Sequence, residues 1–476
     1  MAALATTSKS KPRRRSELGL LLVGMIVVTF AYVLATLGVY NQLPAKFIVF
    51  VAILLGVVVL VNLVNRWLVP EADPVLVPVV LVLNGLGFVM IMRLAPYETL
   101  SAPHLAGFQA AWSLLGVAGY AATLLVVRRS RDLERYRYLI LLLAMFLLVM
   151  PLVPHIGDAA ENIDGVKLWV KLGPVTFQPV EGAKILLVIF FASYFVEKRE
   201  LLSMSTNRVG NHLLPDLRPF GPIAFAWAAS IAVILLEKDI GFSLLLFILF
   251  LAMLWVTTGR WTYIVLGIIA FVVGTYFAAA VLGQVGERID IWLDPWKYLV
   301  KGTAQLGYQP VVGELGLAHG GITGTGLGLG TPQAIPVAQS DFIFAALGEE
   351  LGLIGAAAVI VGFVLVVGSG LRAALRAPSE FSKLVALGLT VTLGFQAFLI
   401  MAGVTRLLPL TGVTLPFVSY GGSSLIANYV LVALVMRISD EGAEAPTPTL
   451  RGVRAVTARR AERRRAARAA RPAAAR

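Results

Sequence analysis

The sequence contains no cysteine and is poor in charged residues. Without cysteine, the chain cannot form disulfides, use thiolate catalysis or bind metals through sulfur. The four histidines are scattered and show none of the spacings that mark a histidine metal site. Charged residues make up 14% of the chain, against roughly 25% in soluble domains. This deficit excludes an ordinary soluble globular protein and predicts a chain embedded in lipid.

The basic excess lies in the two termini. The formal net charge is +13, of which residues 1–17 carry +4 and residues 451–476 carry +9, so the body between them is neutral. Basic tails that flank a neutral apolar body are typical of membrane topology and of attraction to anionic lipid headgroups. We therefore expect membrane lipids, and no nucleic acid, as partners of these tails.

Long apolar runs dominate the rest of the chain, which is 58% hydrophobic. A helix needs roughly 20 apolar residues to cross a bilayer. On this basis we predict an all-α polytopic membrane protein with about twelve transmembrane helices. The predicted spans are 18–40, 45–67, 74–94, 107–127, 135–153, 178–197, 219–236, 239–257, 261–283, 341–370, 382–403 and 416–438.

The distribution of lysine and arginine predicts the orientation of these spans. Basic residues precede the first span and follow the fourth, sixth, eighth, tenth and twelfth spans, which places both termini and all strongly basic loops in the cytoplasm. The opposite face then receives a long loop at roughly 284–340, rich in glycine and carboxylates. We expect a multi-pass protein of the cytoplasmic membrane whose function faces outward.

Three parts follow from these patterns. Residues 1–17 form a basic cytoplasmic tail, residues 18–438 form the transmembrane domain, and residues 439–476 form an Arg/Ala-rich cytoplasmic tail. The composition of this last segment predicts disorder.

Five polar motifs interrupt the apolar body. They are KLWVKLGPVTFQPVEGAK (167–184), EKDIG (237–241), RIDIWLDP (288–295) with GYQ (307–309), SDFIF with GEELG (340–352) and PLTGVTLPFVSYGGSS (409–424). Their order and spacing resemble the SEDS (shape, elongation, division, sporulation) family of RodA and FtsW. The PLTG step is more similar to RodA than to FtsW, and the twelve predicted spans together with EKDIG resemble the actinobacterial RodA type.

The resemblance implies a peptidoglycan glycosyltransferase that polymerises lipid II into glycan strands at the outer membrane face, in elongation or division. It also implies a class B penicillin-binding transpeptidase as partner. No cofactor is evident, although a divalent cation at the diphosphate is compatible with the chemistry. Two alternatives stay open: a lipid II flippase or other lipid transporter, and a catalytically impaired scaffold for the transpeptidase.

The reaction requires a carboxylate that takes a proton from the acceptor hydroxyl. Members of the family carry two Asp-Pro-like steps in the outer loop, and the second aspartate is the catalytic one. This chain keeps the first, Asp294, and lacks the second. Asp294 is therefore the candidate catalytic residue, with Asp290 or Glu314 as alternatives. Because Asp-Pro commonly opens a turn, Asp294 also fits a structural role.

The leaving diphosphate requires positive charge. Glu181 and Lys184 are three residues apart on one helical face, so they could meet the diphosphate or form a buried ion pair. Asp239 matches an acid of the family pattern and equally fits a helix N-terminus. Arg288 and Arg406 are further diphosphate candidates, and a snorkelling role is open for Arg288.

We interpret the glycine-rich run 320–330 as a flexible or re-entrant loop rather than a nucleotide site. Asp341 fits a cap for the following helix. Glu350, in the doubled acid Glu349-Glu350, is unusual inside a span. The motifs themselves supply the other candidate substrate contacts, Gln178, Tyr308, Gln309 and Ser419.

Overall fold

The computed structural model describes most of the chain. The described residues are 14–44, 46–95, 105–153, 168–172, 175–203, 207–209, 212–214, 221–236, 239–281, 283–299 and 304–444. Most of the two predicted tails, and the Glu237-Lys238 pair, lie outside them.

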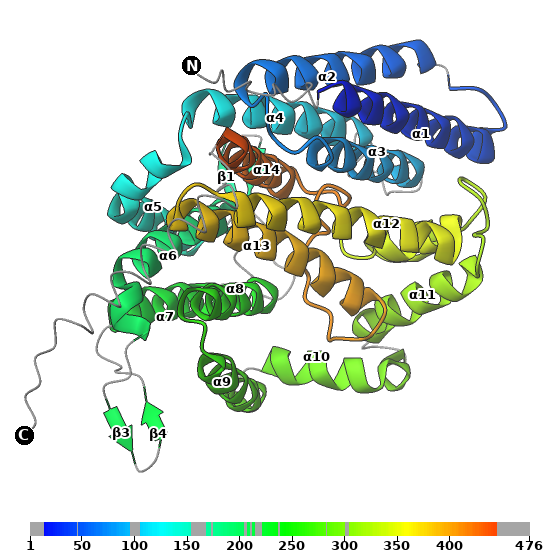
Figure 1. Cartoon of the computed structure of the whole chain (residues 1–476). Coiled ribbons are helices and arrows are strands. Elements are labelled where there is room, and N and C mark those ends of the chain that lie inside the picture. Colours follow the sequence, from blue (N-terminus) through cyan, green and yellow to red (C-terminus); the bar gives the residue numbers. More distant parts are fainter. Residues whose placement is uncertain are drawn as a thin grey trace, which may run out of the picture.

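Helices form nearly all of the described chain (Figure 1). Short antiparallel hairpins pair β1 (Val170–Leu172) with β2 (Val175–Phe177), and β3 (Asn207–Val209) with β4 (His212–Leu214). The 3-10 helices are η2 (Ser130–Tyr136), η3 (Met150–Leu152), η5 (Pro295–Leu299) and η6 (Pro332–Ala334). The α-helices are α1 (Arg14–Tyr40), α2 (Phe47–Leu68), α3 (Leu76–Leu94), α4 (Leu105–Val126), α5 (Arg137–Val149), α6 (Pro179–Ser203), α7 (Gly221–Leu236), α8 (Ile240–Thr258), α9 (Trp261–Val281), α10 (Gly283–Leu293), α11 (Ala304–Gly320), α12 (Ile343–Arg376), α13 (Glu380–Val404) and α14 (Gly422–Glu444).

Each of the twelve predicted spans coincides with a helix. Within the described residues, ten helical segments are long and apolar enough to cross a membrane. The other two predicted spans correspond to α7, which has 16 residues, and to α9, whose shorter apolar stretch is Trp261–Tyr276. The all-α polytopic architecture is confirmed. The predicted outer loop is itself largely helical, because α10, η5, α11 and η6 lie within it.

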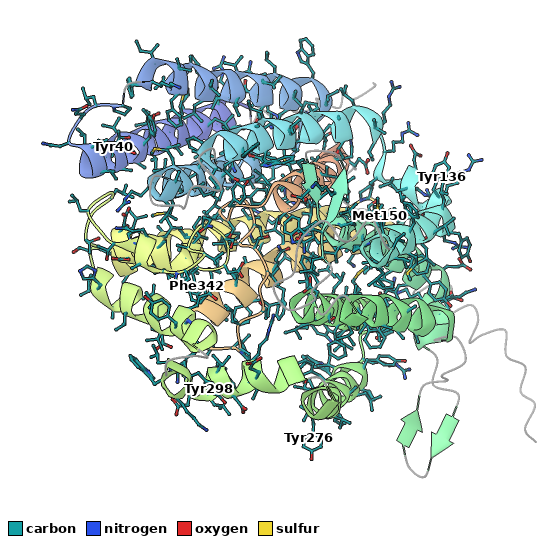
Figure 2. All side chains as sticks on the ribbon, turned by 180° about the vertical axis from the view of Figure 1, so that it is seen from behind. Tyr40, Tyr136, Met150, Tyr276, Tyr298 and Phe342 are labelled. Atoms are coloured by element: carbon teal, nitrogen blue, oxygen red, sulfur yellow. The ribbon has the colours of Figure 1, made fainter. Side chains whose placement is uncertain are left out.

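The structure sorts the loops to two ends of the helix bundle. At one end, Arg199 forms an ion pair with Glu380 (3.1 Å), which joins two predicted cytoplasmic loops. At the other, the Ser419 hydroxyl donates to the Ser340 carbonyl (2.6 Å), which joins two predicted outer segments. Figure 2 shows Tyr40 and Tyr136 at opposite ends of the bundle, and both are exposed, as interfacial tyrosines are.

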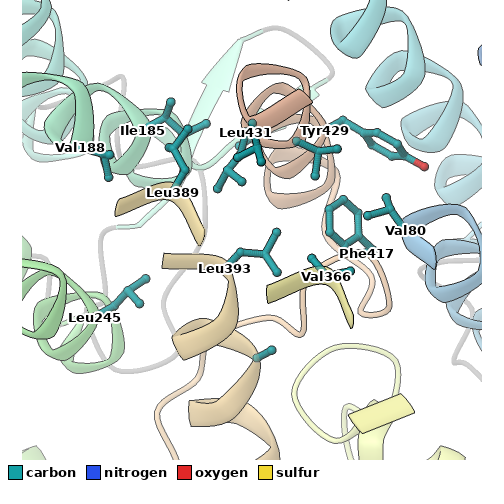
Figure 3. Packing of buried hydrophobic residues seen from close by; sticks show 14 of the residues in the cluster. Val80, Ile185, Val188, Leu245, Val366, Leu389, Leu393, Phe417, Tyr429 and Leu431 are labelled. Carbon is teal, nitrogen blue, oxygen red and sulfur yellow. The ribbon is translucent and has the colours of Figure 1, made fainter. Parts of the chain in front are cut away.

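The central helix of the bundle is α14, which contacts α4, α6, α12 and α13 (Figure 1). Figure 3 shows the interior packing, in which Phe417 and Tyr429 meet edge to face at 5.5 Å. In a membrane, close packing rather than water exclusion holds helices together, and small residues permit it. A Cβ at Gly370 would lie 2.2 Å from the Thr390 hydroxyl, so α12 and α13 approach closely there.

The glycine-rich run 320–330 is held by the doubled acid. Glu350 Oε2 accepts the Gly328 N–H (3.0 Å), and Glu349 Oε1 accepts the Thr331 N–H (2.8 Å). Main-chain oxygens of the same two residues accept further N–H groups of the run. The run is thus a fixed structure anchored on α12, and its backbone is largely committed to that helix.

Arg93 of α3 completes this anchor. Its Nε lies 3.0 Å from Glu350 Oε1, and its Nη2 donates to the Gly330 carbonyl (2.9 Å). Both side chains of the ion pair are almost completely buried. An isolated charge inside a membrane has a high free-energy cost, and here each charge is stabilised by its oppositely charged partner.

The glycine-rich run also satisfies backbone groups that an interruption in α12 leaves without helical hydrogen bonds. Gly352 has φ of +68°, which interrupts the helical hydrogen-bond pattern. The N–H of Leu353 donates instead to the Gly321 carbonyl (2.9 Å). A broken span is tolerated where neighbouring protein satisfies the freed backbone groups.

The first helix packs against the same run. A Cβ at Gly38 of α1 would lie 2.4 Å from the Leu327 carbonyl oxygen and 2.8 Å from the Gly328 Cα. Only glycine at position 38 permits this approach without a shift of backbone. The end of α1 is therefore packed directly against the glycine-rich run.

Replacing Arg93 by methionine is expected to lower the free energy of unfolding by about 3–5 kcal/mol, because Glu350 would keep a buried, uncompensated charge. Denaturant titration in detergent measures this. The matched control is Arg199→Met, which breaks a half-exposed pair and should cost less than about 1 kcal/mol. Equal losses in the two variants would contradict a structural anchor at Arg93.

Candidate functional site

A cavity of about 200 Å³ lies where the predicted outer segments meet. Its walls come from α10, α11, the segment just before α12, the end of α13, and the connection between α13 and α14. Apolar side chains and glycines form most of the lining, together with four polar side chains. These four are Arg288, Gln309, Asp341 and Arg406, all half-buried.

The amphipathic helix α10 positions Arg288. The Nη1 of Arg288 donates to the Leu410 carbonyl (3.3 Å), and one turn further on the Trp292 Nε1 donates to the Arg406 carbonyl (3.0 Å). Both bonds tie α10 to the connection between α13 and α14. The guanidinium of Arg288 is thereby held at the cavity, as the diphosphate hypothesis requires.

Arg406 is held from two sides. Its Nη1 lies 3.3 Å from Glu314 Oε1 of α11, and its Nη2 donates to the Leu293 carbonyl (3.5 Å). Its φ of +57° is unusual for a residue other than glycine. Strained backbone of this kind is concentrated at functional sites, where the surrounding structure enforces it.

Asp341 lines the cavity and does not cap the following helix. The N-cap of α12 is Phe342, and no side-chain cap bond is found there among the described residues, so the expected capping role is wrong. Burial raises the pKa of the Asp341 carboxyl to about 6, while a hydrogen bond with Ser340 and the charge of Arg288 lower it. The carboxyl therefore titrates close to neutral pH beside a guanidinium.

The structure places Asp294 outside the cavity lining. Asp294 is exposed, and its Oδ1 accepts the Lys297 N–H (3.3 Å) at the start of η5. These contacts are those of a turn residue. Of the alternatives, Asp290 is exposed and accepts the Tyr298 hydroxyl (3.4 Å), whereas Glu314 is engaged by Arg406.

Glu181 and Lys184 lie in a separate buried cluster. Lys184 Nζ pairs with Glu181 and donates to Gln396 Oε1 (2.7 Å) and Asn428 Oδ1 (3.3 Å). The Oε1 atom of Glu181 has no hydrogen-bond partner among the residues that the structure describes. The ammonium thus joins α6, α13 and α14, as the ion-pair alternative requires, while a diphosphate role for Lys184 stays a prediction.

Asp239 is the N-cap of α8, as its helix-terminus interpretation predicts. Its Oδ1 accepts the Phe242 N–H (2.9 Å). Burial raises the pKa of Asp239 to about 7; N–H bonds and the charge of Arg288 lower it, and the charge of Glu181 raises it further. Asp239 therefore couples electrostatically to both the cavity and the buried cluster.

Of the other candidate residues, only Gln309 lines the cavity. Gln309 Nε2 donates to the Pro336 carbonyl (3.1 Å), and the Ser419 hydroxyl donates to the Ser340 carbonyl. The Gln178 N–H donates to the Ser423 hydroxyl (2.9 Å), and Tyr308 is exposed on α11. Glu350 is part of the anchor with Arg93 and does not line the cavity.

Sequence reasoning missed several residues of these networks. Arg93 is a single charge inside an apolar run, and that alone is a signal of an intramembrane partner. Trp292, Gln396 and Asn428 carry no such signal, because amides and tryptophan are ordinary near membrane interfaces.

A family model described as "Cell cycle protein", FtsW/RodA/SpoVE, matches residues 74–444, so α1 and α2 precede the matched segment. The chain is 40% identical over 452 residues to the peptidoglycan glycosyltransferase RodA of Mycobacterium tuberculosis, covering 94% of this chain and 95% of the relative. It is 33% identical over 341 residues to a probable peptidoglycan glycosyltransferase FtsW of Geobacter sulfurreducens, covering 71% and 86%.

Two solved structures share the fold. One belongs to a peptidoglycan synthase complex that coordinates polymerization and crosslinking, with a TM-score of 0.62 and 25% identity, covering 78% of this chain and 99% of that one. The other is the rod shape determining protein RodA of Thermus thermophilus, with a TM-score of 0.54 and 24% identity, covering 79% and 98%. The resemblance predicted from the five motifs is confirmed, and the chain belongs to the FtsW/RodA/SpoVE family.

Proposed function

We propose that this multi-pass membrane protein is a peptidoglycan glycosyltransferase that polymerises lipid II at the outer face of the cytoplasmic membrane. The activity printed in the names of its relatives supports the reaction class. The outer cavity, where two arginines and a carboxylate converge, is the observation that carries the proposal.

The cavity matches what the reaction needs. A hydroxyl that attacks an anomeric carbon must lose a proton, and a departing diphosphate must meet positive charge. Arg288 and Arg406 supply two guanidinium groups, whose flat, forked geometry suits phosphate oxygens. The low dielectric of a half-buried cavity strengthens these interactions relative to water.

The diphosphate charge is met by these arginines in our proposal. Among the described residues, no group of three or more histidine and carboxylate side chains could hold a metal ion. Whether the reaction also needs a divalent cation that enters with the diphosphate is tested by comparing polymerisation activity with and without EDTA.

The partner in this proposal is a class B penicillin-binding transpeptidase. One structural neighbour belongs to a complex that coordinates polymerization and crosslinking, which supports a crosslinking enzyme as companion. Both termini and the two segments joined by the Arg199–Glu380 ion pair are proposed to face the cytoplasm, as the basic residues predict.

Purified protein supplied with labelled lipid II is expected to give glycan polymer, seen as a ladder on a gel that muramidase digests. No polymer, with or without an added class B transpeptidase, would contradict the proposal and favour a scaffold. Movement of labelled lipid II across vesicle membranes without polymer would favour a transporter.

Replacing Arg288 or Arg406 by glutamine should lower kcat/KM by roughly 100-fold, because each change removes a charge from the developing diphosphate. The matched control is Arg199→Gln, at the opposite end of the bundle, which should keep the activity of the unmodified chain. If either cavity variant stayed within twofold of the control, its guanidinium would have no part in the reaction.

The orientation can be measured because the chain has no native cysteine. A Leu329→Cys variant, in the exposed glycine-rich run, should react with a membrane-impermeant maleimide on intact cells. An Arg131→Cys variant, exposed at the other end, should react only after permeabilisation. The reverse pattern would invert the proposed topology.

A further inference from the structure

The proposed reaction needs a carboxylate that takes the proton of the attacking hydroxyl, and the sequence motifs do not identify it. The outer loop keeps Asp294 and lacks the second aspartate that the family pattern places after it. Asp294 is exposed and bonded within its own turn. The geometry must therefore supply the proton acceptor from another element.

We propose that Asp341 is the general base of this chain, an inference that rests on the proposed glycosyltransferase function. Among the described residues, Asp341 is the acidic side chain that lines the outer cavity. It shares that lining with Arg288 and Arg406, so the proton acceptor and the groups proposed to meet the diphosphate converge on one space.

The neighbouring carboxylates are less suited to the role. Glu314 is committed to Arg406 at 3.3 Å, and Asp290 faces Tyr298 from the exposed side of α10. Asp239 is used as the N-cap of α8, and it does not line the cavity.

The backbone before Asp341 is fixed by two hydrogen bonds from the connection between α13 and α14. The Tyr420 N–H donates to the Gln339 carbonyl (2.8 Å), and the Ser419 hydroxyl donates to the Ser340 carbonyl (2.6 Å). These bonds reach the two residues directly preceding the carboxylate. They explain why SDF and VSYGG motifs that are distant in the sequence serve one site.

The residue after Asp341 is fixed as well. Phe342 is completely buried, and a Cβ at Gly313 of α11 would lie 2.6 Å from its ring. Because Gly313 has no side chain, the Phe342 ring packs against its backbone, and α11 lies close to the start of α12. With both neighbours held, the Asp341 carboxylate has a defined position, as a general base needs.

The electrostatics agree with this role. The charged groups that line the cavity with Asp341 are Arg288 of α10 and Arg406 of the connection between α13 and α14, while Glu314 of α11 reaches Arg406. Burial raises the pKa of Asp341 to about 6, and Arg288 opposes that rise. A base with a pKa near the working pH is ionised and still accepts a proton efficiently.

The step balances as a simple substitution. The acceptor hydroxyl oxygen forms a bond to the anomeric carbon of the donor, and its proton passes to the Asp341 carboxylate. The bond between that carbon and the diphosphate oxygen breaks, and the electron pair leaves on the diphosphate between the two arginines. The protonated Asp341 then returns its proton to water.

Polymerisation of labelled lipid II by purified Asp341→Asn is expected to show kcat lowered at least about 100-fold, with KM changed little. Asp341→Glu should restore part of the activity, since it retains a carboxylate. Asp290→Asn and Asp294→Asn should stay within a fewfold of the unmodified chain. Detergent thermal melts of every variant show whether each is folded.

The pH profile tests whether the group that titrates in the reaction is an acid coupled to Arg288, and Asp341 and Asp239 both are. Asp239→Asn removes the other such acid and should leave the acidic limb in place. For the unmodified chain, activity should rise with pH through about 6, because only the ionised carboxylate accepts a proton. Arg288→Gln removes a charge that lowers the pKa of Asp341, so its acidic limb should move to higher pH. This variant keeps Asp341, and the shift is measurable even if Asp341→Asn does not fold.

Three results would overturn the inference. An Asp341→Asn variant with more than a tenth of the normal kcat would remove Asp341 from the chemistry. Loss of activity in Asp294→Asn, with Asp341→Asn active, would return the role to the loop. An unshifted acidic limb in Arg288→Gln would show that the titrating group is elsewhere. If the unmodified chain makes no polymer, the proposed function itself fails, which is a distinct outcome.

Discussion

The ion pair between Arg93 and Glu350 is the constraint on which the cavity-bearing end of this molecule depends. It joins the end of α3 to α12 where both side chains are almost completely buried, so that neither charge could stay alone. Through it, α12 holds the glycine-rich run, and the run in turn satisfies the backbone freed at Gly352. The start of α12, including Asp341, is positioned by a helix that is anchored in this way.

The candidate site is an assembly of short segments rather than a single loop. α10 brings Arg288, the segment just before α12 brings Asp341, and the connection between α13 and α14 brings Arg406. The positive charge of Arg288 lowers the pKa of both Asp239 and Asp341, so one guanidinium stabilises the ionised form of two acids. Removing it would alter the protonation of the cavity as well as its positive charge.

The sequence was sufficient for the architecture because hydropathy and basic loops are local signals. All twelve predicted spans are helices, and the family follows from motifs that keep their spacing. The residues of the candidate site could be predicted less well from the sequence. Asp294 lies in the expected sequence motif, yet its side chain is outside the cavity. Asp341 has the sequence position of a helix cap, yet its side chain lines the cavity. Which carboxylate faces a cavity depends on long-range contacts, such as Ser419 to Ser340, that no local pattern encodes.

The contact between Gly38 and the glycine-rich run has a consequence for biogenesis. The ribosome makes α1 first, and its partner surface at Leu327 and Gly328 is made only after the ten α-helices α2 to α11. α1 can pack against α2 and α3 early, because those helices follow it directly in the chain. The contact at Gly38 therefore forms late, once the glycine-rich run has been made and α12 has arrived to hold it.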